Sequence, residues 1–244
     1  MTRSLPAFVR SVVDSLFPPI CPLCRRTIVK EQGSFCDACM TAFSLIIPPY
    51  CARCGIPFSD IQGHTPHRCQ VCLDPSLPDI RIRSIGVFSG PIRACILKFK
   101  YQGDIVMGDS LAQLMVTRFP LFFTVPEYDC ILPVPLHLDR LREREFNQSA
   151  LLAKPLAQLL SLPMDLTSVQ RVRNTTPQSM LGEKDRRKNV KGVYRVVRPD
   201  RIKGKHIMIV DDVCTTGATI EEIAVVLLEK GAARVDAITV ARAA

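Results

Sequence analysis

Ile207-Met-Ile-Val-Asp-Asp-Val-Cys-Thr-Thr-Gly-Ala-Thr219 is the stretch that decides the fold. Its first four residues are apolar, which predicts a buried strand of a parallel sheet over residues 207–210. Asp211 and Asp212 then come at the carboxyl end of that strand, where open α/β sheets bind ligands. The residues from Cys214 to Thr219 predict a turn whose N–H groups and hydroxyls can surround a phosphate. The stretch therefore predicts a site for a phosphorylated sugar.

A helical pattern follows from Gly217 onward. Apolar residues recur at helical spacing and charged residues occupy the other face. A phosphate in the preceding turn would lie at the N-terminus of this helix, where free amides and the helix dipole favour an anion. A strand, turn and helix of no special function would share the hydrophobic pattern. They would not need two adjacent carboxylates, which repel each other, so the pattern favours a binding site.

The stretch resembles the phosphoribosyl pyrophosphate (PRPP) signature of type I phosphoribosyltransferases, Asp-Asp-x-x-x-Thr-Gly-x-Thr. The match covers Asp211, Asp212, Thr216, Gly217 and Thr219. The resemblance implies that the loop holds the 5-phosphate and that the two acids contact the ribose hydroxyls, which makes Asp211 and Asp212 the candidate catalytic pair. The implied PRPP-binding residues are Asp211, Asp212, Val213, Cys214, Thr215, Thr216, Gly217, Ala218 and Thr219.

Eight of the eleven cysteines form four Cys-x-x-Cys pairs in the first third of the chain. Each pair suits two adjacent vertices of a zinc tetrahedron, so four pairs predict two structural Zn²⁺ sites. A redox Cys-x-x-Cys would be expected once, at a helix start. Sequential pairing would give two zinc ribbons in tandem, which we favour, and interleaved pairing a RING- or LIM-like cross-brace. The predicted ligands are Cys21, Cys24, Cys36, Cys39, Cys51, Cys54, Cys69 and Cys72.

The remaining cysteines and two nearby histidines are expected to have other roles. His64 and His67 lie between the last two pairs and could replace a ligand, but eight cysteines already fill two sites. Cys95 and Cys130 lie in apolar runs and are predicted core residues. Cys214 lies in the phosphate turn, where a helix N-terminus could lower its pKa, but we expect it to supply only a backbone amide.

Strands and helices alternate after residue 80, which predicts an α/β fold with a mainly parallel sheet and flanking helices, preceded by a small zinc-ribbon module. The expected boundaries are an amphipathic helix at 1–20, a double zinc ribbon at 21–74 and a phosphoribosyltransferase-like domain at 80–244. We expect strands at 82–88, 128–134, 164–169, 193–197, 207–210 and 235–240, helices at 92–99, 107–118, 146–160 and from 217, and a polar turn at 100–104. Neither a signal peptide nor a membrane span is evident, so we expect a cytoplasmic protein.

Positive charge concentrates in the second half of the chain. The formal net charge is +9, and residues 139–205 hold sixteen Lys or Arg against seven Asp or Glu. This suits a polyphosphate and equally suits nucleic acid. Residues 167–191 are polar and basic, which predicts a lid, although a solvated loop or a nucleic-acid patch would have the same composition. The candidate lid and pyrophosphate residues are Lys100, Arg171, Lys184, Arg186 and Arg187, and the turn Leu132-Pro-Val-Pro-Leu136 is a second candidate element.

The whole chain resembles the competence protein F (ComF) family, which joins a cysteine-rich zinc module to a type I phosphoribosyltransferase-like domain. Besides the cysteine pairs and residues 211–219, the resemblance rests on five motifs. They are Phe99-Lys-Tyr-Gln-Gly-Asp104, Pro133-Val-Pro135, Arg142-Glu-Arg-Glu-Phe-Asn-Gln148, Arg171 with Thr176-Pro-Gln178, and Arg187-Lys-Asn-Val190. Glu145 departs from the family, which usually has glycine there. The resemblance implies a role in DNA uptake during natural transformation, with single-stranded DNA and other DNA-uptake proteins as partners.

Two functions remain open on this sequence. In the first, PRPP binds with Mg²⁺, held through substrate oxygens and waters, and a phosphoribosyl group passes to an unidentified acceptor. In the second, the domain senses PRPP or a nucleotide without catalysis, and its basic loop and ribbons hold single-stranded DNA. Tryptophan is absent from the chain, which argues against DNA binding dominated by base stacking.

Overall fold

A computed structural model describes residues 18–28, 33–58, 67–124, 127–144, 146–173 and 189–243. Most of the predicted N-terminal helix, together with His64, Glu145, Lys184, Arg186 and Arg187, lies outside these ranges.

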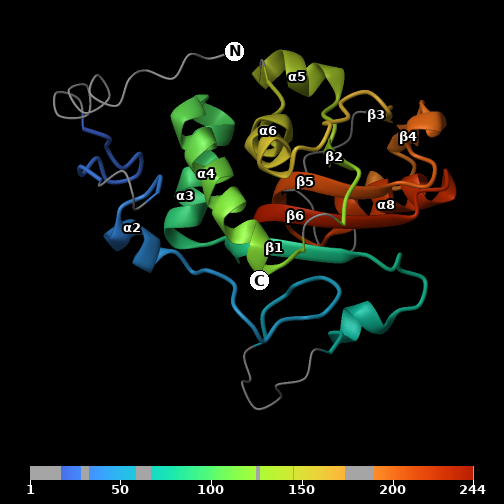
Figure 1. Cartoon of the computed structure of the whole chain (residues 1–244), viewed down its shortest axis with the longest axis horizontal. Helices are drawn as coiled ribbons and strands as arrows, with labels where there is room; N and C mark the ends of the chain where they lie inside the picture. Colours follow the sequence, from blue (N-terminus) through green and yellow to red (C-terminus); the bar gives the residue numbers. More distant parts are fainter. Residues whose placement is uncertain are drawn as a thin grey trace.

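The centre of the fold is a four-stranded parallel sheet in the order β1-β6-β5-β2 (Figure 1). Its strands are β1 (Arg81–Val87), β2 (Cys130–Pro133), β5 (His206–Cys214) and β6 (Arg234–Arg242). Val210 of β5 pairs with Ile238 of β6 on one side and with Pro133 of β2 on the other. The predicted fold class, a parallel α/β sheet with flanking helices, is confirmed.

Helices pack on one face of the sheet and form the larger core. They are α3 (Gly90–Gln102), α4 (Ile105–Arg118) and α6 (Gln148–Leu160). Their buried apolar residues cluster with Met208 and Val210 of β5 and with Ile238 of β6. The alternation of strand side chains turns Ile207 and Ile209 to the opposite face.

That opposite face is covered by α8 (Ala218–Glu229) and by the antiparallel pair β3 (Val169–Arg171) and β4 (Tyr194–Val196). Shorter elements complete the chain: α2 (Asp37–Ala42), η2 (Gln70–Leu73), η3 (Phe119–Leu121), α5 (Leu138–Arg144) and η5 (Pro199–Arg201). No helix in the described parts of the chain combines the length and apolar character needed to cross a membrane.

Figure 1 shows the cysteine-rich segment running from α2, which lies beside α3, to a position next to β1. Backbone hydrogen bonds tie it to that strand: Ile46 N donates to Ile85 O at 2.9 Å, and Val87 N donates to Ser44 O at 2.8 Å. Residues 44–46 of the cysteine-rich segment therefore extend the hydrogen bonding of the sheet beyond β1.

Several predicted boundaries are wrong for local reasons. The strand expected at 164–169 is reduced to a bridge at Met164 and to Val169, the first residue of β3. Between them the Asp165 carboxylate accepts bonds from the amides of Thr167 and Ser168 and forms a turn. The polar turn expected at 100–104 is largely helix, since α3 continues to Gln102 and ends at Gly103 with φ of 63°. The strand expected at 128–134 is shortened to Cys130–Pro133.

The other expected elements differ from the structure mainly at their ends. The helix expected from 146 begins at Gln148, because the Asn147 side chain caps it by accepting from the amides of Ser149 and Ala150. The strand expected at 207–210 extends through Cys214, so the two acids lie in the last part of β5 and not beyond it. The helix expected from Gly217 begins one residue later, with Gly217 as its N-cap.

Candidate functional site

Asp211 and Asp212 lie near the carboxyl end of β5 and have different partners. Ser149 Oγ, at the start of α6, donates to Asp211 Oδ1 at 2.9 Å, and the Asp212 amide donates to the same oxygen at 2.9 Å. Burial, followed by the negative charge of Asp212, raises the pKa of Asp211 from 3.8 to about 7. Asp211 can therefore exchange a proton near neutral pH.

Asp212 forms an ion pair with Lys100. Lys100 Nζ lies 2.8 Å from Asp212 Oδ1, and both side chains are mostly buried. Lys100 extends from the last turn of α3 to this second acid. That it also faces the pyrophosphate stays a prediction. The cation offsets the repulsion between the two carboxylates.

The predicted phosphate loop joins β5 to α8. Gly217, its last residue, has φ of 84°, a conformation that glycine adopts without strain. Thr216 Oγ1 accepts from the Ala218 amide at 3.4 Å, and α8 begins at Ala218. The loop thus lies at the N-terminus of a twelve-residue helix, as an anion site requires.

Cys214 is buried behind this loop. Burial raises the pKa of its thiol to about 11, opposite to the lowering that a helix N-terminus could produce. Its Sγ accepts a hydrogen bond from Arg242 Nη1 at 3.1 Å. A buried thiol with a raised pKa is a poor nucleophile. That Cys214 supplies a backbone amide to the phosphate stays a prediction.

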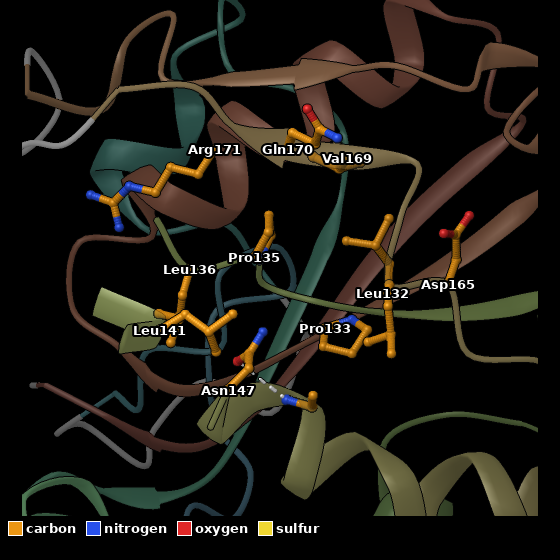
Figure 2. Close-up of a pocket in the computed structure, with 12 residues that line it drawn as sticks. Leu132, Pro133, Pro135, Leu136, Leu141, Asn147, Asp165, Val169, Gln170 and Arg171 are labelled. Carbon is orange, nitrogen blue, oxygen red and sulfur yellow. Dashed lines mark hydrogen bonds between the residues drawn. The ribbon is translucent and has the colours of Figure 1, made fainter. Parts of the chain in front are cut away.

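A cavity of about 420 Å³ lies where β2 ends, between the start of α6 and β3 (Figure 2). Pro133 and Pro135 line it together with Arg171, whose guanidinium lies 5.9 Å from the centre of the Tyr194 ring. Figure 2 shows Arg171 extending from β3 over the turn that carries Pro135 and Leu136. Two segments that we expected to face the pyrophosphate thus border one cavity, although half of the residues that line it are leucine or proline.

The cysteines form two separate tetrads. They are Cys21, Cys24, Cys36 and Cys39, and Cys51, Cys54, Cys69 and Cys72; within each, the four sulfur atoms lie within 4.8 Å of one another. A Zn–S bond of about 2.3 Å in a tetrahedron requires S–S separations of about 3.8 Å, and the Cys54 and Cys69 sulfurs are 3.8 Å apart. Both tetrads therefore fit structural zinc.

This grouping confirms the sequential pairing, and the interleaved cross-brace is wrong. The His67 ring lies outside both tetrads and stacks on Phe58, with ring centroids 4.1 Å apart. Cys95 and Cys130 are buried in the two cores, as predicted.

Sequence reasoning named Lys100 as a site residue but not as the partner of Asp212, and it missed Ser149, the partner of Asp211. Ser149 follows the Phe-Asn-Gln motif, and that position was the only signal for it. It also missed two buried arginines, Arg53 and Arg242, for which the chain offers no spacing rule.

The site and the ribbons together define a class of protein: a double zinc ribbon joined to a phosphoribosyltransferase fold. Family models agree, with a double zinc ribbon domain matching residues 12–73 and a phosphoribosyl transferase domain matching residues 147–244.

Curated relatives match over nearly their full length. The DNA utilization protein YhgH of Salmonella typhi is 34% identical, with 89% of this chain and 94% of that protein covered. Competence protein F of Haemophilus influenzae is 32% identical over 91% of this chain and 96% of that protein. Competence protein ComFC of Bacillus subtilis is 27% identical, covering 88% of this chain and 87% of that protein. The chain belongs to the competence protein F (ComF) family.

Among solved structures, the chain is similar to the glutamine PRPP amidotransferase of B. subtilis, at 23% identity and a TM-score of 0.34. That match covers 54% of this chain and 24% of the amidotransferase.

Proposed function

We propose that the chain binds PRPP at the carboxyl end of β5 and serves DNA uptake. The supporting observation is the arrangement of the acid pair: Asp212 is neutralised by Lys100 at 2.8 Å, beside a loop at the N-terminus of α8. In this proposal residues 213–219, which comprise the loop and the adjoining ends of β5 and α8, hold the 5-phosphate through backbone amides and hydroxyls. Asp211 and Asp212 then accept hydrogen bonds from the ribose hydroxyls.

Mg²⁺ enters the proposal with the substrate. A hard cation prefers oxygen ligands and keeps several waters, so pyrophosphate oxygens and ribose hydroxyls would supply most of its contacts. The bound cation would reduce the negative charge of the pyrophosphate. The chain itself contributes Asp211 and Asp212, which orient the ribose, and the basic segment that contains Arg171, Lys184, Arg186 and Arg187.

Transfer of the phosphoribosyl group is the finer hypothesis. An acceptor nitrogen would attack the anomeric carbon with its lone pair, the bond to the pyrophosphate oxygen would break, and pyrophosphate would leave with that electron pair. The acceptor would release a proton. The cavity beside Pro133 and Arg171 is large enough for a small acceptor and borders the turn that we assign to the pyrophosphate. Release of pyrophosphate from PRPP across a panel of bases and amines tests this step.

The role in DNA uptake rests on the relatives, which are named for DNA utilization and for competence. An excess of nine basic residues between 139 and 205, sixteen against seven, supports a second proposal, that the same domain contacts single-stranded DNA. Binding to a single-stranded oligonucleotide should then weaken steeply with salt. Changing Arg186 and Arg187 to alanine should reduce both the affinity and its salt dependence, and unchanged affinity would exclude this segment as the DNA surface.

Calorimetry with PRPP and Mg²⁺ tests the central proposal. The informative variant is Asp212→Asn, and Asp109→Asn, an exposed acid on α4, is the matched control. We expect binding by the wild type and the control and a loss of at least about tenfold for Asp212→Asn, because a charged hydrogen-bonding group typically contributes about 1.5–3 kcal/mol. Absence of binding by the wild type would refute the proposal.

A further inference from the structure

The second zinc ribbon meets the phosphate loop through two buried arginines. Arg53 lies inside the Cys51–Cys54 pair and is 3% exposed, and Arg242 lies at the end of β6 and is 5% exposed. Arginine is rarely buried to this degree unless it is paired. The partners of these two side chains therefore decide what they do.

Arg53 connects a zinc ligand to helix α8. Its Nη1 lies 2.9 Å from Glu221 Oε1 and 3.5 Å from Cys72 Sγ. Its Nε donates to Pro78 O at 2.9 Å. One guanidinium thus spans a ligand of the second tetrad, the backbone before β1 and a carboxylate of the phosphoribosyltransferase fold.

Glu221 belongs to the first turn of α8, next to the loop. Its amide donates to Gly217 O at 2.9 Å, and a Cβ built on Gly217 would lie 3.8 Å from Glu221 Oε1. A phosphate bound by the loop would therefore lie close to this buried carboxylate. Without a counter-charge the carboxylate would repel the phosphate, and the repulsion would be strong because little water screens it.

Arg242 makes a second connection between the same parts. Its Nη1 donates to Cys54 O at 2.9 Å and to Cys214 Sγ at 3.1 Å. Cys54 is a ligand of the second tetrad, and Cys214 is the last residue of β5 before the loop. The two arginines thus come from opposite sides of the interface and join the same ribbon to the two ends of the loop.

The Cys51–Cys54 segment also rests directly on β1. Ile82 N donates to Arg53 O at 2.8 Å, and a Cβ on Gly55 would lie 2.6 Å from Ile82 O, too close for any residue but glycine. Ile82 Cδ1 in turn would lie 3.5 Å from a Cβ on Gly217. Backbone contact and packing therefore fix the position from which Arg53 reaches Glu221.

We propose that Arg53 is a positioning residue of the phosphate loop. The second ribbon holds its guanidinium against Glu221, which fixes the first turn of α8 and cancels the repulsion between Glu221 and a bound phosphate. The second of these effects rests on the proposed function, since it concerns the sugar phosphate. The first concerns the loop itself and holds whatever the ligand.

Calorimetry with PRPP and Mg²⁺ tests the effect on binding, using zinc-loaded full-length protein whose metal content is measured. Arg53→Gln should lower the affinity at least about tenfold, within the range of coupling between buried charges. Adding Glu221→Gln to that variant removes the carboxylate charge that Arg53 no longer neutralises and should restore the affinity to within about threefold of wild type. Arg68→Gln, which breaks the exposed pair with Asp79 in the same ribbon, is the control and should bind as wild type.

If the role of Arg53 were purely structural, adding Glu221→Gln would not restore the affinity for PRPP. A double variant that binds PRPP as weakly as Arg53→Gln would therefore overturn the electrostatic part of the proposal. Unchanged affinity in Arg53→Gln would overturn it as well.

Hydrogen exchange without ligand tests the effect on the loop independently. Exchange over residues 214–222 should be faster in Arg53→Gln than in wild type and unchanged in Arg68→Gln. Equal exchange in Arg53→Gln and wild type would overturn the positioning role. Failure of the wild type to bind PRPP would refute the proposed function only, and the exchange result would still decide the role of Arg53.

If the Arg53→Gln protein loses zinc, the exchange experiment is repeated with the single variant Glu221→Gln, which leaves every ribbon residue in place. At full zinc content it should also exchange faster over residues 214–222. Unchanged exchange there would again overturn the proposal.

Discussion

The two zinc ribbons have the same ligand pattern but contact the rest of the chain in different ways. Cys21, Cys36 and Cys39 of the first tetrad belong to the large core, in one cluster with Ile92 and Cys95 of α3. The buried cysteines of the second tetrad form a small cluster of their own with Ile56 and Phe58. The second ribbon reaches the sheet and the phosphate loop through hydrogen bonds and one buried ion pair.

Because of this difference, we expect the two ribbons to affect the stability of the chain and the geometry of the sugar-phosphate site in different ways. Apolar contacts are non-directional, so the first ribbon adds stability without specifying how a distant group is placed. Hydrogen bonds and ion pairs are directional, and breaking a buried one leaves a group without its partner. We therefore expect a defect in the first ribbon to reduce stability, and a defect in the second to reduce stability and also alter the sugar-phosphate site.

Removing one zinc ligand from each ribbon should have the largest effect. Cys21→Ser and Cys51→Ser should each lose about one zinc ion per chain and several kcal/mol of stability, because zinc binding supplies much of the folding free energy of such modules. Only Cys51→Ser should also reduce the affinity for PRPP, by at least about tenfold in folded protein. Metal analysis, thermal unfolding and calorimetry measure the three effects, and equal loss of affinity in both variants would remove the distinction between the ribbons.

Substitution of Asp211 changes the sugar-phosphate site without touching either ribbon, and it serves as a reference for the ribbon variants. The Asp211 pKa of about 7 in the folded protein exceeds the 3.8 of an ordinary aspartate, so wild-type stability should fall as the pH rises from about 4 to about 7. Asp211→Asn has no carboxylate to ionise and should become more stable than wild type over that interval. We expect a difference near zero at pH 4 and about 2–4 kcal/mol at pH 8.

Urea unfolding at several pH values measures this difference. A constant difference between the two proteins from pH 4 to pH 8 would contradict the raised pKa.

Arg242 tests the second link between ribbon and loop. Arg242→Met would keep most of the side-chain volume but remove the donors to Cys54 O and Cys214 Sγ. A buried carbonyl without its partner costs about 1–3 kcal/mol, which should appear as a lower midpoint of urea unfolding. Arg195→Met, on the exposed side of β4, is the matched control, and a similar loss in that variant would show that Arg242 has no special role.

Arg68 should have the smallest effect. Its pair with Asp79 is solvent-exposed, with side-chain exposures of 46% and 86%, and such pairs contribute about 0–1 kcal/mol. Arg68→Gln should unfold within about 0.5 kcal/mol of wild type at moderate salt. A larger loss would mean that the second ribbon also depends on surface charges.

The parts of the molecule that local pattern encodes could be predicted from the sequence. Cysteine spacing predicted both tetrads, and the stretch 207–219 predicted a buried strand, a loop and a helix in the correct order. Helix and strand ends were predicted less accurately. Single side chains such as Asp165 and Asn147 accept hydrogen bonds from nearby backbone amides, and a hydrophobic pattern does not reveal these bonds.

The contacts that complete the site could not be predicted. Ser149 and Asp211 are 62 residues apart in the chain, and Arg53 and Glu221 are 168 apart. No periodicity relates such positions, and Ser149, Arg53 and Glu221 each look like ordinary surface residues in the sequence. Only the packing of α6 and of the second ribbon against the sheet brings them together.

Strand β1 has a consequence for how the chain can be divided. It is an outer strand of the four-stranded sheet. Backbone groups of residues 44, 46 and 53 form hydrogen bonds with the edge of β1 that faces away from β6. Removing residues 1–79 would leave those N–H and C=O groups of β1 without partners, and an unpaired strand edge can recruit strands from other molecules. We therefore expect the phosphoribosyltransferase fold to self-associate through β1 when it is produced without the zinc ribbons.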